Sequence, residues 1–222
     1  MTRLLFWDVD TLYDFMRADG RLYVPGSEEI IPTVGELTTF AHARGIPIVA
    51  SADNHEETDA EISDTPDWST TFPPHCMRGT PGQRKIPETA LADPLVIEPE
   101  LQDPGALAHR LLAHRGDVLF HKRTLDVFSN ANVPTLLRAL EPEAIAIYGV
   151  ATDFCVKYTV EGLLRHAPRA DLFLVLDAVR PIRADAGERL LASWRDRGVH
   201  LTTAAQLVSE RAQAAGAAAA GV

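Results

Sequence analysis

The chain has 222 residues, of which 46% are hydrophobic and 23% charged, and its mean hydropathy is −0.05. This composition is typical of a globular protein with one substantial core. The formal charge of −10 argues against nucleic acid or an anionic membrane surface as a partner. No run is long and apolar enough to span a membrane, and the first residues do not resemble a secretory signal, so we expect a cytoplasmic protein. The two cysteines, Cys76 and Cys155, exclude a disulfide framework.

Short apolar runs alternate with helical patterns along the chain. The expected elements, in order, are a strand at 4–7, a helix opened by Pro32 and ended by Gly45, a strand at 46–50, a helix capped by Asp103 and Pro104, strands at 118–121 and 144–148 around a helix at 134–140, a helix at 153–166, a strand at 172–176, a helix at 185–197 and an edge strand at 200–203. The region 51–103 has little periodicity, and a loop of that length usually carries function.

Repeated strand–helix units with non-alternating strands predict an α/β fold. We expect a three-layer α/β/α architecture with a mainly parallel, doubly wound sheet of about six strands. Residues 1–210 are predicted to form one domain, and residues 211–222 a low-complexity, Ala-rich tail. In such folds the chemistry gathers beyond the carboxyl ends of the strands.

Cys155 is a candidate nucleophile at that edge of the sheet. It lies in Gly149-Val150-Ala151-Thr152-Asp153-Phe154-Cys155-Val156, a predicted strand-to-helix turn. The positive end of the helix dipole and free backbone N–H groups favour a thiolate and stabilise an oxyanion. The alternative is a small buried hydrophobic residue, the commonest role of a free cysteine.

Two further charged residues follow predicted strands at the same edge. Asp8 ends an apolar strand, which suits a proton acceptor beside a thiol, although a turn aspartate is the simpler interpretation. Lys122 follows Phe120 and His121, where a buried ammonium needs an anionic partner. Their convergence with Cys155 favours a catalytic set.

A metal site is the second constellation. Asp53 and His55 follow one strand, and His75 lies on the long loop, so one oxygen and two nitrogens are available for a divalent ion. Glu61 or Asp64 is an additional candidate ligand. Surface loops often carry these residue types, so the spacing alone does not establish a site.

A phosphatase is the alternative enzyme class. The segment from Phe6 to Asp14 resembles the Asp-x-Asp motif of the haloacid-dehalogenase-like phosphatases, with Asp8 as nucleophile and Asp10 as acid. The usual Gly before Thr11 is missing, however, and no late acidic pair follows a strand to hold magnesium. A non-catalytic relative that binds a small molecule is a third reading.

Four motifs resemble the isochorismatase-like cysteine hydrolases, and among them the nicotinamidase branch. Asp8-Val9 with Asp14-Phe15 resembles the opening Asp-Val-Gln-Asn-Asp-Phe of that branch if Thr11-Leu12 is an insertion on the pocket wall. The second motif, Asp53-Asn54-His55 with the segment from Phe72 to Gly82, resembles the family's metal-site segments. The third, Phe120-His121-Lys122, resembles its lysine strand, and the fourth, the turn from Gly149 to Val156, resembles its nucleophile turn.

The resemblance implies a catalytic triad of Asp8, Lys122 and Cys155 that cleaves an amide through a thioester. The N–H groups of Ala151 and Cys155 form the implied oxyanion hole, with a cis peptide before Ala151.

The resemblance also implies a bound metal and an aromatic pocket. Asp53, His55 and His75 would hold one divalent metal, zinc first and iron or manganese next, that ligates the substrate ring, and Phe15 and Phe72 would flank that ring. Nicotinamide is the leading substrate, a carbamoyl or ureido compound the alternative, and we expect a homo-oligomer.

Overall fold

The computed structural model describes residues 4–210, so the predicted tail lies outside the described residues. The strands are β1 (Leu4–Val9), β2 (Ile48–Asp53), β3 (Leu95–Ile97), β4 (Val118–Lys122), β5 (Ala144–Val150), β6 (Asp171–Arg180) and β7 (His200–Thr202). The helices are α1 (Tyr13–Met16), α2 (Ser27–Arg44), α3 (Pro104–Ala113), α4 (Val133–Leu140), α5 (Cys155–His166) and α6 (Ala184–Asp196), with 3-10 turns η1 (Pro81–Gln83), η2 (Pro87–Thr89) and η3 (Val127–Ser129).

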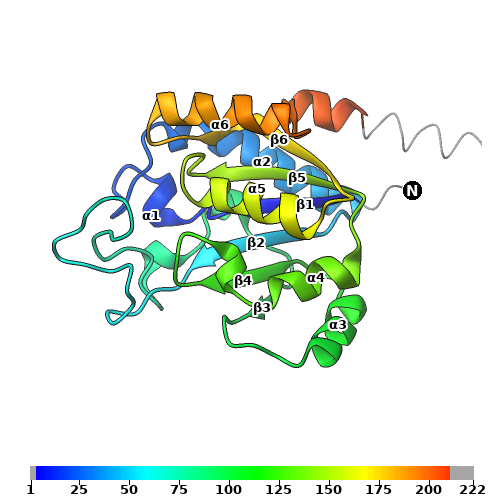
Figure 1. Ribbon diagram of the computed structural model, residues 1–222, viewed down its shortest axis with the longest axis horizontal. Helices are drawn as coiled ribbons and strands as arrows, with labels where there is room; N and C mark the ends of the chain where they lie inside the picture. The colour runs from blue at the N-terminus through cyan, green and yellow to red at the C-terminus, as the bar shows by residue number, and fades with distance from the viewer. Residues whose placement is uncertain (1–3, 211–222) are drawn as a thin grey trace, which may run out of the picture.

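The strands form one sheet in the order β3-β4-β2-β1-β5-β6-β7, and every pair is parallel. Helices cover both faces of the sheet, which confirms the three-layer α/β/α prediction (Figure 1). The sheet has seven strands rather than about six. The additional strand, β3, is only three residues long and lies inside the region expected to be a loop, so it is too short to produce a periodic signal.

Two apolar clusters cover the two faces of the sheet. Side chains alternate along β1, so that Leu5, Trp7 and Val9 join the cluster under α5, whereas Phe6 joins the cluster under α2. β5 is buried along its whole length, as expected for a central parallel strand. This alternation decides on which side of the sheet each polar residue of β1 lies.

Local signals at helix ends were partly correct. Asp103 accepts a hydrogen bond from the Ala106 N–H, and Pro104 is the first helical residue of α3, as predicted. Gly45 ends α2 in the left-handed conformation, with φ at 61°. The prediction that Pro32 opens this helix is wrong, because α2 begins at Ser27 and holds Pro32 in its second turn.

The chain crosses over at the centre of the sheet, where β1 lies between β2 and β5. The connection after β1 runs to one side and that after β5 to the other, so a crevice opens beyond the carboxyl ends of these strands. The loops that follow β1, β2, β4 and β5 meet there. Among residues 4–210, no helix combines the length and the apolar character that a membrane crossing requires.

Candidate active site and metal centre

Cys155 begins α5, directly after the turn that follows β5. Its side chain is buried and lines a pocket together with Ala151 and Phe154. The peptide bond between Val150 and Ala151 is cis, as the resemblance implied. Within this turn, the N–H groups of Phe154 and Val156 both donate to the Ala151 carbonyl. The predicted nucleophile therefore lies at a helix start that faces a cavity.

Lys122 is the centre of the charged residues at this edge of the sheet. Its side chain is fully buried at the end of β4, and its ammonium donates a hydrogen bond to Asp53, lies 2.9 Å from Asp10 Oδ2 and lies 3.6 Å from Cys155 Sγ. Burial lowers the pKa of a lysine, but here the carboxylates of Asp10 and Asp53 outweigh it and raise the pKa of Lys122 well above its usual value. The two carboxylates thus stabilise the charged form of Lys122.

Asp10 takes the position that we assigned to Asp8. It follows β1 with φ at 49°, a left-handed conformation that turns its carboxylate toward the site. The Ser51 hydroxyl donates to Asp10 Oδ1 at 2.6 Å, and Asp10 Oδ2 forms the ion pair with Lys122. Asp10, Asp53 and Cys155 each place one polar atom within 4.8 Å of the others.

Asp8 is held elsewhere, so the prediction that Lys122 pairs with it is wrong. The Asp8 carboxylate lies 2.9 Å from the Lys85 ammonium and accepts a hydrogen bond from the Thr11 hydroxyl at 2.9 Å. Asp8 follows Phe6 by two residues in β1 and therefore faces the α2 side of the sheet, away from Cys155. Its partners tie the segment 84–89 to the end of β1.

A spacing in the sequence already indicated Asp10. Three residues separate the two aspartates in the segment Asp10-Thr11-Leu12-Tyr13-Asp14-Phe15. The family motif Asp-Val-Gln-Asn-Asp-Phe has the same spacing. Aligned in this way, the motif needs no insertion at Thr11-Leu12. The second aspartate then has a role too, because Asp14 Oδ2 accepts the Cys76 N–H at 2.7 Å and orders the loop that carries His75.

Burial of the Cys155 sulfur works against the thiolate that the helix start is expected to favour. Burial raises the pKa of Cys155 well above its usual value. Lys122 opposes this effect, whereas the carboxylates of Asp10 and Asp53 add to it. A reaction at this sulfur therefore needs a group that accepts its proton.

Four buried side chains form the candidate metal centre: Asp53, His55, Glu61 and His75. One ligand atom from each lies within 4.8 Å of the others. Asp53 Oδ2, His55 Nε2 and Glu61 Oε1 are buried without a hydrogen-bond partner among the described residues, and unpartnered buried polar atoms are costly. The three predicted ligands thus converge, and the four side chains fit a divalent cation.

Of the two candidates for a fourth metal ligand, Glu61 and Asp64, only Glu61 belongs to the buried group. Asp64 is exposed. Glu61 Oε1 lies 3.8 Å from His55 Nε2 and 4.0 Å from His75 Nε2. Burial and the charge of Asp53 raise the pKa of Glu61 to about 7 in the absence of a cation. Burial acts on Asp53 in the same direction, but Lys122 and the two imidazoles hold its pKa below the usual range.

Outer contacts orient both imidazoles toward this centre. His75 Nδ1 donates a hydrogen bond to the Pro73 carbonyl at 2.8 Å. The proton is therefore on Nδ1, and the lone pair of His75 Nε2 can coordinate a cation. His55 Nδ1 lies 3.3 Å from the Asp59 carboxylate, so its Nε2 is likewise turned inward. Such outer partners are typical of histidine ligands in metal sites.

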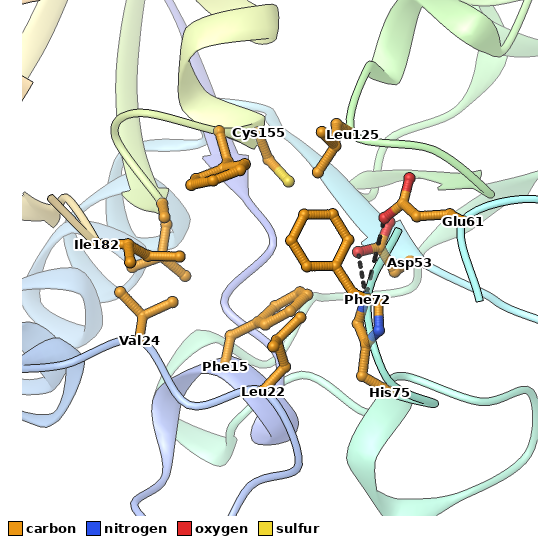
Figure 2. Close-up of a pocket in the computed structure, with 13 residues that line it drawn as sticks. Phe15, Leu22, Val24, Asp53, Glu61, Phe72, His75, Leu125, Cys155 and Ile182 are labelled. Carbon is orange, nitrogen blue, oxygen red and sulfur yellow. Dashed lines mark ion pairs between the residues drawn. The ribbon is translucent and has the colours of Figure 1, made fainter. Parts of the chain in front are cut away.

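The pocket between Cys155 and the metal centre is narrow and mostly apolar (Figure 2). Figure 2 shows Phe15 and Phe72 between His75 and Cys155, so both predicted aromatic residues line it. The cavity measures about 30 Å³. A ring-sized ligand therefore requires movement of wall side chains such as Phe72, whose ring packs edge-on against Phe154 at 5.8 Å.

The chain belongs to the isochorismatase family: the family model for the Isochorismatase domain matches residues 2–206. Nicotinamidases are among its relatives. It is 28% identical over 195 residues to the nicotinamidase/pyrazinamidase of Mycobacterium tuberculosis, which covers 87% of this chain and 95% of that protein.

Two further relatives bear on the site. The pyrazinamidase of Pyrococcus horikoshii, solved in complex with zinc, superposes with a TM-score of 0.70 at 26% identity, over 90% of this chain and 99% of that one. The N-carbamoylsarcosine amidase of Arthrobacter is 26% identical over 141 residues, which is 63% of this chain and 46% of that protein. The zinc-bound relative and the buried four-residue group together indicate a divalent-metal site.

Proposed function

We propose that this protein is a cysteine amidohydrolase that cleaves a small amide to a carboxylate and ammonia, with nicotinamide as the leading substrate. One observation carries the proposal: the Lys122 ammonium lies 2.9 Å from Asp10 and 3.6 Å from the Cys155 sulfur, which lines a narrow pocket. A thiol, a carboxylate and a fixed cation are what thioester chemistry on an amide requires.

Attack on the amide begins with transfer of the Cys155 proton to Asp10 as the sulfur bonds to the carbonyl carbon. The carbonyl electron pair moves to its oxygen, and we assign the N–H groups of Ala151 and Cys155 to that oxyanion. The protonated Asp10 then gives its proton to the amide nitrogen. The carbon–nitrogen bond breaks, ammonia leaves and a thioester remains on Cys155.

Hydrolysis of the thioester uses the same groups in reverse. Asp10 takes a proton from water while the water oxygen bonds to the thioester carbon. The carbon–sulfur bond then breaks, the proton on Asp10 returns to the sulfur, and the product leaves as a carboxylic acid that releases its remaining proton to water. Lys122 and the Ser51 hydroxyl hold Asp10 in place, and the ammonium stabilises negative charge on both Asp10 and Cys155.

The metal would be held by Asp53, His55, Glu61 and His75. Two imidazoles and two carboxylates suit zinc first, with iron or manganese as alternatives. When bound, it supplies a Lewis-acid position for a ring nitrogen of the substrate. Phe15 and Phe72 then provide apolar surfaces for the ring.

The alternative substrates need pockets of different shape and size. Its aromatic lining favours a ring, whereas its small volume favours a carbamoyl or ureido compound, for which the Arthrobacter relative gives a precedent. The phosphatase reading has no support in the geometry, because Asp8, its nucleophile, is fully buried and paired with Lys85.

Ammonia release from a substrate panel tests the proposal. The purified, metal-loaded protein is given nicotinamide, benzamide as the matched ring without nitrogen, N-carbamoylglycine and an aryl phosphate. We expect ammonia from nicotinamide at a kcat/KM well above that for benzamide. Phosphate release without ammonia from any amide would overturn the proposal, and a preference for N-carbamoylglycine would replace nicotinamide as the substrate.

A further inference from the structure

A second, larger cavity adjoins the outer side of the inner pocket. We call it the outer chamber; it measures about 590 Å³ against about 30 Å³ for the inner pocket. The two cavities share five wall residues: Leu22, Phe72, Leu125, Phe154 and Ile182. Ile182 is 41% exposed, so the chamber lies on the solvent side of the shared wall. The outer chamber is therefore reached from the inner pocket across the shared wall residues.

Positive charge predominates in the outer chamber. Lys157 lines it, with its ammonium 5.3 Å from the centre of the Tyr158 ring, and has no ion-pair partner among residues 4–210. Arg183 also lines it, and its guanidinium lies 3.7 Å from Asp153, the chamber's one carboxylate. Asp153 already accepts the N–H groups of Ile182 and Arg183 at 2.8 and 3.0 Å. In a chain of net charge −10, the wall of this chamber carries two cations against one engaged anion.

Aromatic side chains complete the wall. Tyr23 and Tyr158 line it, and Trp68 lies at its rim with 61% of its surface exposed. Asp67 holds the turn that carries Trp68, because its carboxylate accepts the N–H groups of Ser69, Thr70 and Thr71. The exposed indole of Trp68, held on this turn beside the cavity, offers a flat apolar surface to a ligand in the outer chamber.

We propose that the outer chamber is a substrate subsite that selects amides whose acyl group carries an anionic arm. This inference rests on the proposed amidase function: the amide carbon would sit at Cys155, and the arm would pass the shared wall into the chamber. There Lys157 and Arg183 pair with its negative charge, and Trp68 covers its carbon atoms. Within the proposed amidase function, amides whose acyl part carries an acidic arm should thus be favoured over the same amides with a neutral arm.

The test compares two nicotinamides that bear the same short arm, ending either in a carboxylate or in the isosteric primary alcohol. The quantity measured is the ratio of their kcat/KM values, which cancels any general loss of activity. For the wild-type protein we expect the carboxylate to be favoured about threefold to tenfold, as for a charge pair at a partly exposed site. This preference should shrink as ionic strength rises.

Variants assign the preference to the chamber. Lys157→Met should lower the ratio, and Lys157→Met combined with Arg183→Met should bring it close to one. Arg165→Met is the matched control, since it removes one positive charge from the exposed end of the same helix and lines no part of the chamber; it should keep the wild-type ratio. Trp68→Ala should weaken binding of both armed amides, seen as a higher KM.

Each outcome either supports the subsite or overturns it. Hydrolysis of nicotinamide with no preference between the two arms, or with equal ratios in Lys157→Met and Arg165→Met, overturns the subsite and leaves the amidase proposal standing. Absence of ammonia from all amides overturns both. A carboxylate preference that is reduced in Lys157→Met and kept in Arg165→Met supports the subsite.

Discussion

Lys122 donates a hydrogen bond to Asp53, whose other carboxylate oxygen faces His75 Nε2 at 3.7 Å in the metal group. One aspartate thus joins the cation of the catalytic set to the metal centre. Because Asp53 and Glu61 face two imidazoles and Lys122 faces two carboxylates, the charges of the two sites are balanced together rather than separately.

Replacing Lys122 with Met should therefore have two effects. Ammonia release should be lost, because Asp10 loses its ion-pair partner, and the free energy of unfolding should fall by about 3–5 kcal/mol, since two buried carboxylates are left unpaired. At pH 7.5, added zinc should raise the melting temperature of Lys122→Met more than that of the wild type, because the competing cation is gone. A smaller zinc effect in the variant would contradict the shared balance.

The metal centre predicts one divalent ion per chain in the active protein, measured by elemental analysis. His55→Ala, His75→Ala and Glu61→Gln should each weaken the metal affinity by at least about 100-fold, since each removes a direct ligand. Asp64→Ala is the matched control on the same loop, and it should bind the metal like the wild type. Full metal content in the histidine variants would remove the site.

The oriented imidazole of His55 gives a finer prediction. Asp59→Ala removes the carboxylate at His55 Nδ1 and should lower the metal affinity about 10-fold, less than loss of a ligand. Competition with a chromogenic chelator measures this difference. If Asp59→Ala and His55→Ala lose the same metal affinity, the substitutions disrupt the fold of the loop rather than the coordination of the metal.

Alkylation by iodoacetamide probes the thiol in the metal-free protein. Cys155 should react before Cys76, because Cys155 lines the pocket whereas Cys76 is fully buried. Since the pKa of Cys155 is raised, its thiolate fraction is small at neutral pH. The alkylation rate should therefore increase at a higher pH than it does for an unperturbed cysteine. Asp10→Asn should speed alkylation at fixed pH, because loss of the nearby negative charge lowers the pKa of the sulfur.

Mass spectrometry after limited reaction assigns the modified cysteine, and Cys76→Ala serves as the control that retains both alkylation and turnover. Cys155→Ala should lose amide hydrolysis by at least about a thousandfold, as expected when a covalent nucleophile is removed. Undiminished turnover in Cys155→Ala would rule out the thioester.

Asp8 should matter for stability instead of chemistry. Asp8→Asn breaks its ion pair with Lys85, and we expect a lower free energy of unfolding by about 1–3 kcal/mol. A double-mutant cycle with Lys85→Met measures the coupling between the two side chains. If the two losses simply add, the 2.9 Å contact contributes no interaction of its own.

The fold was largely predictable, because buried parallel strands and capped helices leave strong local patterns. β3 was missed since three residues carry no period, and Pro32 misled because a proline in the second turn of α2 looks like a helix start. In the site, residue types at strand ends predicted Cys155 and Lys122 at one edge. The spacing between Asp10 and Asp14 favoured Asp10 over Asp8, but the prediction aligned the motif on Asp8 instead. The structure separates the two aspartates by strand alternation and by the positive φ of Asp10. Glu61 was separable from Asp64 only by burial.

The most direct test compares kcat for Asp10→Asn and Asp8→Asn on the same amide, with ammonia release as the readout. An asparagine cannot accept the thiol proton, so Asp10→Asn should lose about 10²- to 10⁴-fold in kcat. Asp8→Asn should stay within about tenfold of the wild type below its melting temperature, as a general base is retained. A severe loss in Asp8→Asn together with near-normal turnover in Asp10→Asn would contradict the Cys155–Asp10–Lys122 site.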